Sequence, residues 1–221
     1  MTIRAKLATA IIVAVAGLAL TAGVGIWGMN SLGDKFDDVR AAGEAQALAL
    51  ELKYDITDFN GWQTAYGYDN GASRPVFLSS VQQFREDLAA AKKELTSPPE
   101  QKLLADMEEA FKAFMTLDVV AYRALQAGKS DEVRRLFLGP EIRNFQRAAS
   151  AAEDLAALEA ARAAETEKAF DDAQTDALRL LILASIVAAV LVALLLVTAF
   201  DLARAAERTL AAAPPPDEPA V

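Results

Sequence analysis

The chain has 221 residues, of which 53% are apolar and 24% are charged, and its formal net charge is −9. It contains neither cysteine nor histidine, which excludes a disulfide framework and removes the usual ligands of zinc, haem and iron–sulfur centres. The same absence removes the Cys nucleophile and the His general base, and the negative charge argues against a nucleic-acid-binding surface. We therefore expect a protein that is not an enzyme and that holds no cofactor or metal.

The first element in chain order is an uncharged apolar run from Leu7 to Trp27, preceded by Arg4 and Lys6. About 20 apolar residues are enough to cross the hydrocarbon core of a bilayer as a helix, and a terminal Trp is a common anchor at the interface. A cleaved signal peptide also combines a basic start with an apolar run. This run is longer than a usual signal core and continues into a helical pattern without a break, which favours a retained transmembrane helix.

Helical periodicity dominates the region that follows. The first stretch ends at Asn70-Gly71, the second at Ser97-Pro98-Pro99 and the third at Gly128, because these residues are strong helix breakers. The predicted helices cover 29–69, 76–95, 99–127 and 140–179, with a short helix from Ser130 to Gly139 before the last.

The lengths of these helices predict their arrangement. The first and fourth each cover about 40 residues, or roughly 60 Å at the helical rise of 1.5 Å per residue, so they can run side by side. The two shorter helices between them have short connections. We therefore expect an all-α fold with an up-down-up-down four-helix bundle between two transmembrane helices.

A second uncharged run extends from Leu180 to Phe200, and its apolar residues cover every face of a helix. We expect a second transmembrane helix here. Basic residues lie before the first run and after the second, at Arg4, Lys6, Arg204 and Arg208. The positive-inside tendency then places both termini in the cytoplasm.

The expected organisation is a cytoplasmic amino terminus, a transmembrane helix, an extracytoplasmic bundle domain, a second transmembrane helix and a Pro-rich cytoplasmic tail, over 1–6, 7–28, 29–179, 180–200 and 201–221. We therefore expect a two-pass protein of the cell inner (plasma) membrane. Its fourth helix has an Ala-rich seam at Phe145, Ala149, Ala152, Ala156, Ala163, Phe170 and Ala173. Because such a seam buries little area, we expect a homodimer along the long helices.

Three features resemble the amino-terminal sensor module of methyl-accepting chemotaxis receptors, the type with a four-helix-bundle ligand-binding domain. They are the opening TIRAKLATAIIVAVAGLALTAGVGIWGMNSL, the segment DITDFNGWQTAYGYDN, and the order of span, bundle and span. The resemblance implies a transmembrane receptor for signal transduction in chemotaxis, with a small-molecule ligand outside the membrane and a heterodimer with a full-length receptor as a further possible partner.

Receptors of this group continue into a HAMP relay and a signalling coiled coil, whereas only residues 201–221 follow the second span here. The expectation is a sensor without its own output module. The alternative is a structural or scaffolding membrane protein whose helical bundle binds another protein.

In the resembled family, ligands bind between the first and fourth helices. Counting equal lengths from the two spans sets Trp62 level with Phe145, and the candidate ligand-binding residues at this level are Trp62, Gln63, Tyr66, Arg143 and Arg147. Aromatic faces beside Arg and amide groups can hold a small anion or an amino acid. The same Trp and Tyr can instead pack in the core.

A polar cluster at Asp55, Asp58 and Asn60 lies below this level. Its oxygens are of the kind that bind calcium, but no EF-hand loop accompanies them. We interpret the cluster as a solvated helix face.

Overall fold

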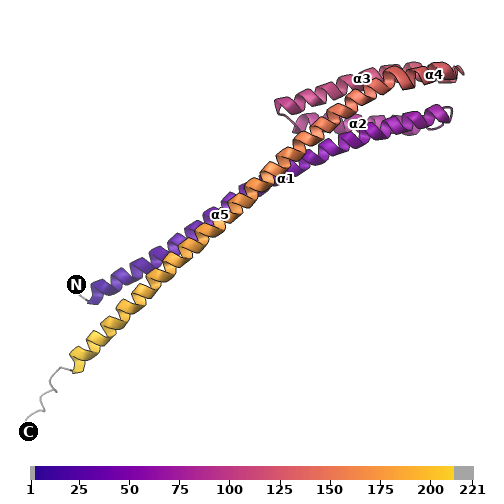
Figure 1. The fold of residues 1–221 in the computed structure, drawn as a ribbon. Helices are drawn as coiled ribbons and strands as arrows, with labels where there is room; N and C mark the ends of the chain where they lie inside the picture. The colour runs from indigo at the N-terminus through magenta and orange to yellow at the C-terminus, as the bar shows by residue number, and fades with distance from the viewer. Residues whose placement is uncertain (1–2, 212–221) are drawn as a thin grey trace, which may run out of the picture. The chain divides into compact units, whose positions relative to one another are not determined.

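The computed structural model describes residues 3–211, and every regular element in this part of the chain is a helix. The elements are α1 (Ile3–Tyr68), α2 (Arg74–Glu94), α3 (Pro98–Gln126), α4 (Ser130–Leu136), the π-helical turn η1 (Phe137–Glu141) and α5 (Ile142–Ala211) (Figure 1). The expected all-α class is confirmed for these residues. The outer parts of the two predicted terminal segments, 1–2 and 212–221, lie outside the described residues, as does the side chain of Leu7.

Two compact units make up the chain. The first, called the two-helix unit below, contains residues 1–36 and 169–221; the second, called the core unit, contains residues 37–168. The core unit is shorter at both ends than the domain expected over 29–179.

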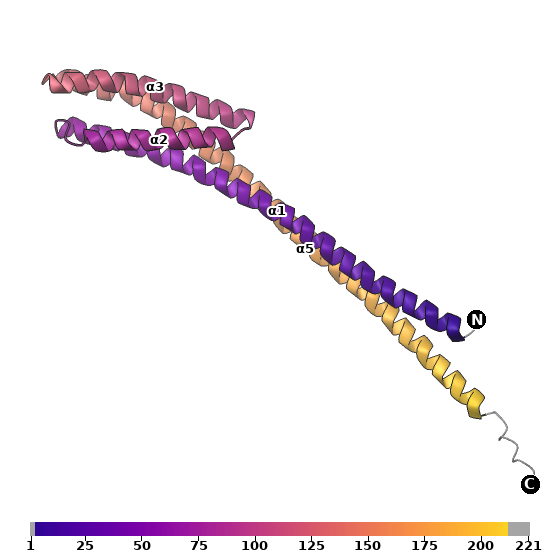
Figure 2. The same ribbon diagram turned by 180° about the vertical axis from the view of Figure 1, so that it is seen from behind.

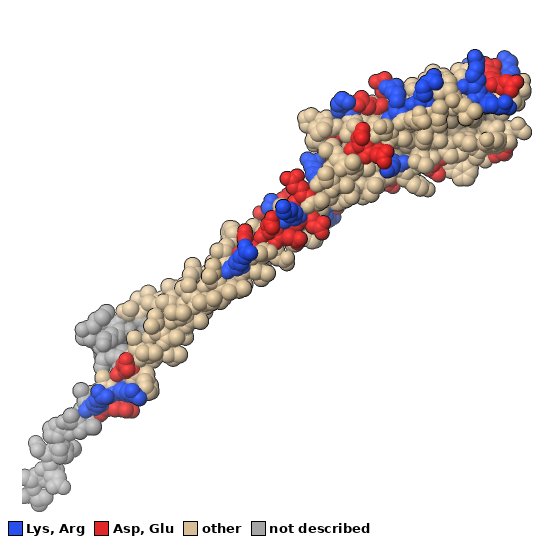
Figure 3. All heavy atoms as spheres, in the orientation of Figure 1, with Lys and Arg blue, Asp and Glu red and all other residues tan. Residues whose placement is uncertain are grey.

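Long apolar helices form the two-helix unit. An 18-residue window has a mean hydropathy of 2.1 in α1 and of 3.3 in α5, so both helices are long and apolar enough to cross a membrane, as the two apolar runs predicted. Their large side chains stand exposed, with exposed fractions of 57% at Trp27, 42% at Leu180 and 58% at Phe200. Figure 3 shows these stretches as a surface without charged side chains.

Small residues and one aromatic pair join α1 to α5 within the two-helix unit. A Cβ atom added to Gly17 would lie 3.8 Å from Ala188, and one added to Gly28 would lie 3.5 Å from Ala177. The rings of Phe36 and Phe170 meet edge to face with their centroids 6.4 Å apart. Gly and Ala at such contacts let two helix backbones approach closely.

Aromatic rings fill the centre of the core unit. Phe59 is fully buried, and its ring centroid lies 5.4 Å from that of Phe84, 5.6 Å from that of Phe111 and 5.2 Å from that of Phe114. The apolar residues of one face of α2 are buried, at Phe77, Val81, Phe84 and Leu88, and Leu95 directly after the helix is buried as well. Helices α1, α2, α3 and α5 all contribute to this core, and α2 and α3 run beside the other two in both views (Figure 2).

The predicted break at Asn70-Gly71 is confirmed. Both residues have positive φ, 55° at Asn70 and 93° at Gly71, a region that Asn and Gly adopt most readily. The Asp69 carboxylate accepts the backbone N–H of Ser73 at 3.0 Å, which closes the turn into α2.

The predicted start of the fourth long helix is wrong. The short helix does not end at Gly139; it continues through η1, which contains Pro140, and α5 begins at Ile142. A π-helical turn widens the helix and can accommodate a residue that lacks a backbone N–H. The buried face of α5 overlaps the predicted seam in part: Ala152 and Ala156 are buried as expected, whereas Ala148, Leu155 and Glu159 are buried outside it.

Candidate functional site

A buried polar cluster lies at the end of the core unit formed by the turn between α1 and α2. We call it the Asp118 cluster; its members are Gln63, Tyr66, Arg74, Asp118 and Glu141. The Asp118 side chain is fully buried on α3. Arg74, the first residue of α2, donates from Nη1 to Oδ1 at 2.7 Å, and its Nη2 atom forms an ion pair with Oδ2 at 2.6 Å. From α1, the Tyr66 hydroxyl and the Gln63 amide also donate to Oδ1, the latter at 3.1 Å.

Three aromatic rings surround the guanidinium of Arg74. Its Cζ atom lies 4.8 Å from the ring centroid of Tyr66, 4.9 Å from that of Phe77 and 4.3 Å from that of Tyr122. Burial by itself would lower the pKa of Arg74, but hydrogen bonding to Asp118 and the charge of Asp118 outweigh it and raise that pKa. The guanidinium therefore stays charged although aromatic rings surround it, and cation–π contacts with these rings add to its ion pair with Asp118.

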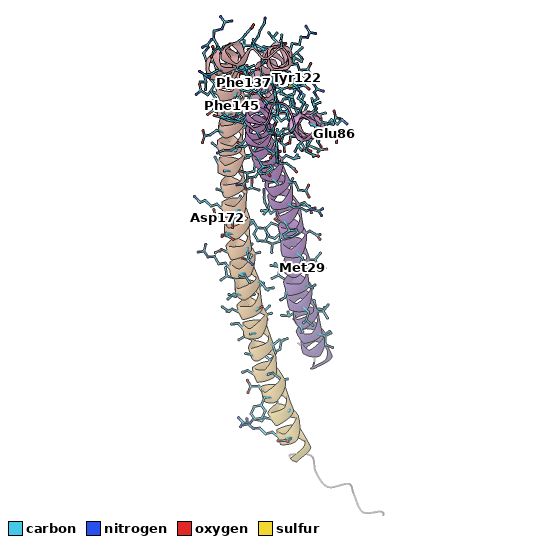
Figure 4. All side chains as sticks on the ribbon, turned by 90° about the vertical axis from the view of Figure 1, so that its right-hand side faces the viewer. Met29, Glu86, Tyr122, Phe137, Phe145 and Asp172 are labelled. Atoms are coloured by element: carbon cyan, nitrogen blue, oxygen red, sulfur yellow. The ribbon has the colours of Figure 1, made fainter. Side chains whose placement is uncertain are left out.

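Burial also shifts the acidity of Tyr66. The pKa of its phenol is raised, first by desolvation and then by the charge of Asp118 and by the hydrogen bond to it. Its ring packs edge to face on Tyr122 and Phe137, with centroids 5.9 Å apart in both cases. Phe137 and Tyr122 lie in the same region of the core unit in Figure 4.

Glu141 is the member of the cluster whose buried carboxyl group has the fewest hydrogen-bond partners. It is 1% exposed, and no hydrogen bond of ordinary geometry reaches either carboxyl oxygen. Burial and the nearby charge of Asp118 raise its pKa to about 8, while Gln63 and Arg74 act in the opposite direction. At neutral pH this side chain is mostly a neutral carboxylic acid.

An open cavity of about 350 Å³ borders the cluster at Gln63. Helix α1 lines one side of it, and α4, η1 and the start of α5 line the other. Its polar groups come from Asn60, Gln63, Thr64, Ser130 and Arg134, and its apolar walls include Phe137 and Ile142. A pocket of this volume and mixed lining suits a small molecule with both apolar and hydrogen-bonding groups.

Gly67 makes room for one wall of this cavity. A Cβ atom at Gly67 would lie 2.5 Å from the ring atom Cε2 of Phe137, so any side chain there would displace the ring. The glycine of α1 thus sets the position of Phe137, which faces both the cavity and Tyr66.

The structure separates the residues that the sequence proposed as ligand contacts. Gln63 and Tyr66 belong to the Asp118 cluster, and Gln63 lines the cavity. Trp62 is 37% exposed, and its Nε1–H donates to Asp58 on the same helix at 3.1 Å. Arg143 is exposed, and Arg147 pairs with Glu109 of α3 at 3.1 Å. The lining of the cavity includes neither Arg143 nor Arg147 nor Trp62.

Sequence analysis missed Arg74 and Asp118. A signal for Asp118 was present, because it continues the apolar spacing of Met107, Phe111 and Phe114 on α3 and so occupies a buried position. An acidic residue at such a position must be neutralised or paired. Its partner could not be read from the sequence, since Arg74 lies 44 residues away.

Comparison with protein-family models, with curated proteins and with solved structures returned no match for this chain.

Proposed function

We propose that the chain is a membrane-anchored sensor of the chemoreceptor type, whose core unit binds a small molecule outside the cytoplasm. The observation that carries the proposal is a cavity with polar and apolar walls beside the Asp118 cluster, in a helical unit flanked in sequence by two exposed apolar helices. The apolar helices fit a bilayer by length and composition. Basic residues favour cytoplasmic termini: Arg4 and Lys6 precede the first apolar stretch, and Arg204 and Arg208 follow the second.

The proposed architecture of the core unit is an up-down-up-down bundle of α1, α2, α3 and α5. Two short connections support it: five residues, 69–73, join α1 to α2, and 95–97 join α2 to α3. Connections of this length favour antiparallel neighbours in helical bundles. The shared core to which all four helices contribute is consistent with this arrangement.

The cavity defines the class of ligand. Amide groups of Asn60 and Gln63 and hydroxyl groups of Thr64 and Ser130 can both donate and accept hydrogen bonds. Arg134 adds a positive charge at the lining, partly compensated by Asp131 at 3.6 Å. A small amphiphilic acid, with its carboxylate toward Arg134 and its apolar part toward Phe137, satisfies these groups.

A thermal-shift screen of the full chain in detergent against small carboxylic and amino acids tests the sensor function. A ligand should raise the melting temperature of the wild-type chain, because it binds only the folded state. Thr64→Leu fills the cavity and should abolish this shift. Trp62→Ala is the matched control on the same helix and should leave it intact. No shift with any compound would overturn small-molecule sensing and favour a scaffold that binds another protein.

We also propose that two copies pair through α1. One face of α1 points away from the core. Six exposed positions recur on it every three or four residues, at Gly43, Ala47, Leu50, Tyr54, Thr57 and Gly61. Leu50 is 50% exposed and Tyr54 68%, and nothing lies within 4 Å of a Cβ atom added to Gly43 or Gly61. Large and small residues in a 3-4 repeat suit a helix pair with close approach.

Cysteine crosslinking tests this pairing, and the absence of native cysteine makes single-cysteine variants unambiguous. Leu50→Cys and Tyr54→Cys should form disulfide-linked dimers in membranes. Ser150→Cys, exposed on α5, is the control and should stay monomeric. Single-cysteine variants also report topology: after mild reduction frees the thiols, Tyr54→Cys and Ser150→Cys should react with a membrane-impermeant maleimide in intact cells, and Glu207→Cys only after permeabilisation. Equal crosslinking at all sites would contradict the pairing.

A further inference from the structure

Asp55 lies buried in the core unit instead of on a solvated helix face. It is 5% exposed on α1, and its Oδ2 atom has no hydrogen-bond partner. The group that acts on it most strongly is the carboxyl of Asp87 on α2, which is close enough to share a proton with it. The other charged groups that act on it are Glu51 and Asp58 of its own helix, which are acidic as well. Two carboxyl groups can share a hydrogen bond only when one of them carries a proton.

A second buried acid pair joins α3 to α5. Glu100 is 1% exposed and Glu159 is fully buried, and both carboxyl groups lie against the guanidinium of Arg162. Arg162 bonds Glu100, while its Nη1 atom lies 3.7 Å from the nearer oxygen of Glu159. Neither oxygen of Glu159 has a donor at hydrogen-bonding distance. One arginine therefore compensates one carboxylate, and the second needs a proton.

The acidity of these groups agrees with their geometry. Burial first, and then the hydrogen bond and the charge of Asp87, raise the pKa of Asp55 from 3.8 to about 7. Burial and the charge of Glu100 raise the pKa of Glu159, against the effect of Arg162. For Glu100 itself, burial is outweighed by hydrogen bonds from Ser97, so its pKa is lowered and it is the partner that stays ionised.

We propose that the core unit is a proton sensor: the pairs Asp55–Asp87 and Glu100–Glu159 each bind one proton that clamps two helices together, and loss of that proton loosens the clamp. The first pair joins α1 to α2 and the second joins α3 to α5. Without the proton, each pair brings two negative charges together at a site where at least one carboxyl is shielded from water.

Protons are a better fit than a metal ion. Among residues 3–211, no group of three or more acidic side chains is arranged to hold a metal. Proton binding at the two acid pairs is also independent of the cavity, since neither pair contributes to the cavity lining. A proton response would therefore persist if the ligand proposed above did not exist.

The direction of the response follows from linkage. An acid whose pKa is higher in the folded than in the unfolded chain stabilises the fold fully below its unfolded pKa and loses that stabilisation as the pH rises through its folded pKa. For Asp55 this window runs from 3.8 to about 7, and Glu141, with its pKa of about 8 beside Asp118, Gln63 and Arg74, extends it in the same direction.

Thermal unfolding of the full chain in a non-ionic detergent, without added ligand, tests the proposal. The melting temperature should fall by about 5 °C or more between pH 5 and pH 8. Asp55→Asn, which mimics the protonated acid, should raise the melting temperature at pH 8 and flatten its dependence on pH. Asp154→Asn, an exposed aspartate on α5, is the matched control and should keep the wild-type slope.

A second measurement locates the effect. Amide hydrogen exchange, corrected for its intrinsic pH dependence, should accelerate in α2 between pH 5 and pH 8 in the wild type but not in Asp55→Asn. Asp87→Asn removes the same repulsion from the side of α2 and gives the same test if Asp55→Asn fails to fold. A melting temperature that is constant or rises with pH would overturn the proposal. So would a stabilisation by calcium at pH 8 that Asp55→Asn abolishes, because the pair would then bind a cation.

Discussion

Asp118→Ala should destabilise the core unit by about 3–5 kcal/mol, the cost of breaking a buried ion pair by removing one partner. The Asp118 carboxylate accepts hydrogen bonds from Arg74, Tyr66 and Gln63. The Arg74 side chain is only 12% exposed and is surrounded by three aromatic rings. Removal of the Asp118 carboxylate leaves its guanidinium without a counter-charge there. The measurement is chemical unfolding of the full chain in detergent, followed by circular dichroism.

Two further substitutions make the result specific. Asp106→Ala on the same helix removes an exposed carboxylate that pairs with Lys102 at 2.7 Å, and it should cost less than about 0.5 kcal/mol. Arg74→Met in the Asp118→Ala background removes the unpaired charge and should recover part of the loss. A loss below about 1 kcal/mol for Asp118→Ala would show that water or the protein re-pairs Arg74 without cost.

Phe59→Ala should cost about 3–5 kcal/mol through lost burial and the cavity it leaves. The Phe59 ring is fully buried and touches the rings of Phe84 on α2 and of Phe111 and Phe114 on α3. These rings lie on helices other than α1, so no local adjustment within α1 can refill the space. The same unfolding experiment measures the effect.

Leu78→Ala is the control for this substitution. Leu78 is 46% exposed on α2, and its truncation should change the free energy of unfolding by no more than about 0.5 kcal/mol. If Phe59→Ala were as mild as Leu78→Ala, the four-ring cluster would not be the centre of the core.

Several elements of the structure could be predicted from the sequence because their causes are local. An uncharged run that is apolar on every face gives a long helix with exposed apolar side chains, as α1 and α5 show. The buried face of α2 carries apolar residues at steps of three and four, the spacing that marks one face of a helix. The turn at Asn70-Gly71 followed from the tolerance of Asn and Gly for positive φ.

The path from α4 to α5 was missed because it depends on a wider turn of helix. Proline and glycine usually end a helix, and Gly139-Pro140 suggested a break. In the structure the π-helical turn η1 carries both residues and places Glu141 in the buried cluster. Helix propensity alone does not predict such a turn. The turn is accompanied by tertiary packing of Phe137 against Gly67 and Tyr66, residues of another helix.

The sequence by itself determined that the chain is helical and where its apolar runs lie. The tertiary structure alone decided that Arg74 meets Asp118, that Asp55 meets Asp87, and that Trp62 faces solvent while Gln63 lines the cavity. These outcomes depend on the rotation and relative shift of neighbouring helices. A rotation of one residue position, about 100°, exchanges a core side chain for a solvated one, and helical periodicity fixes a face only to within about that angle.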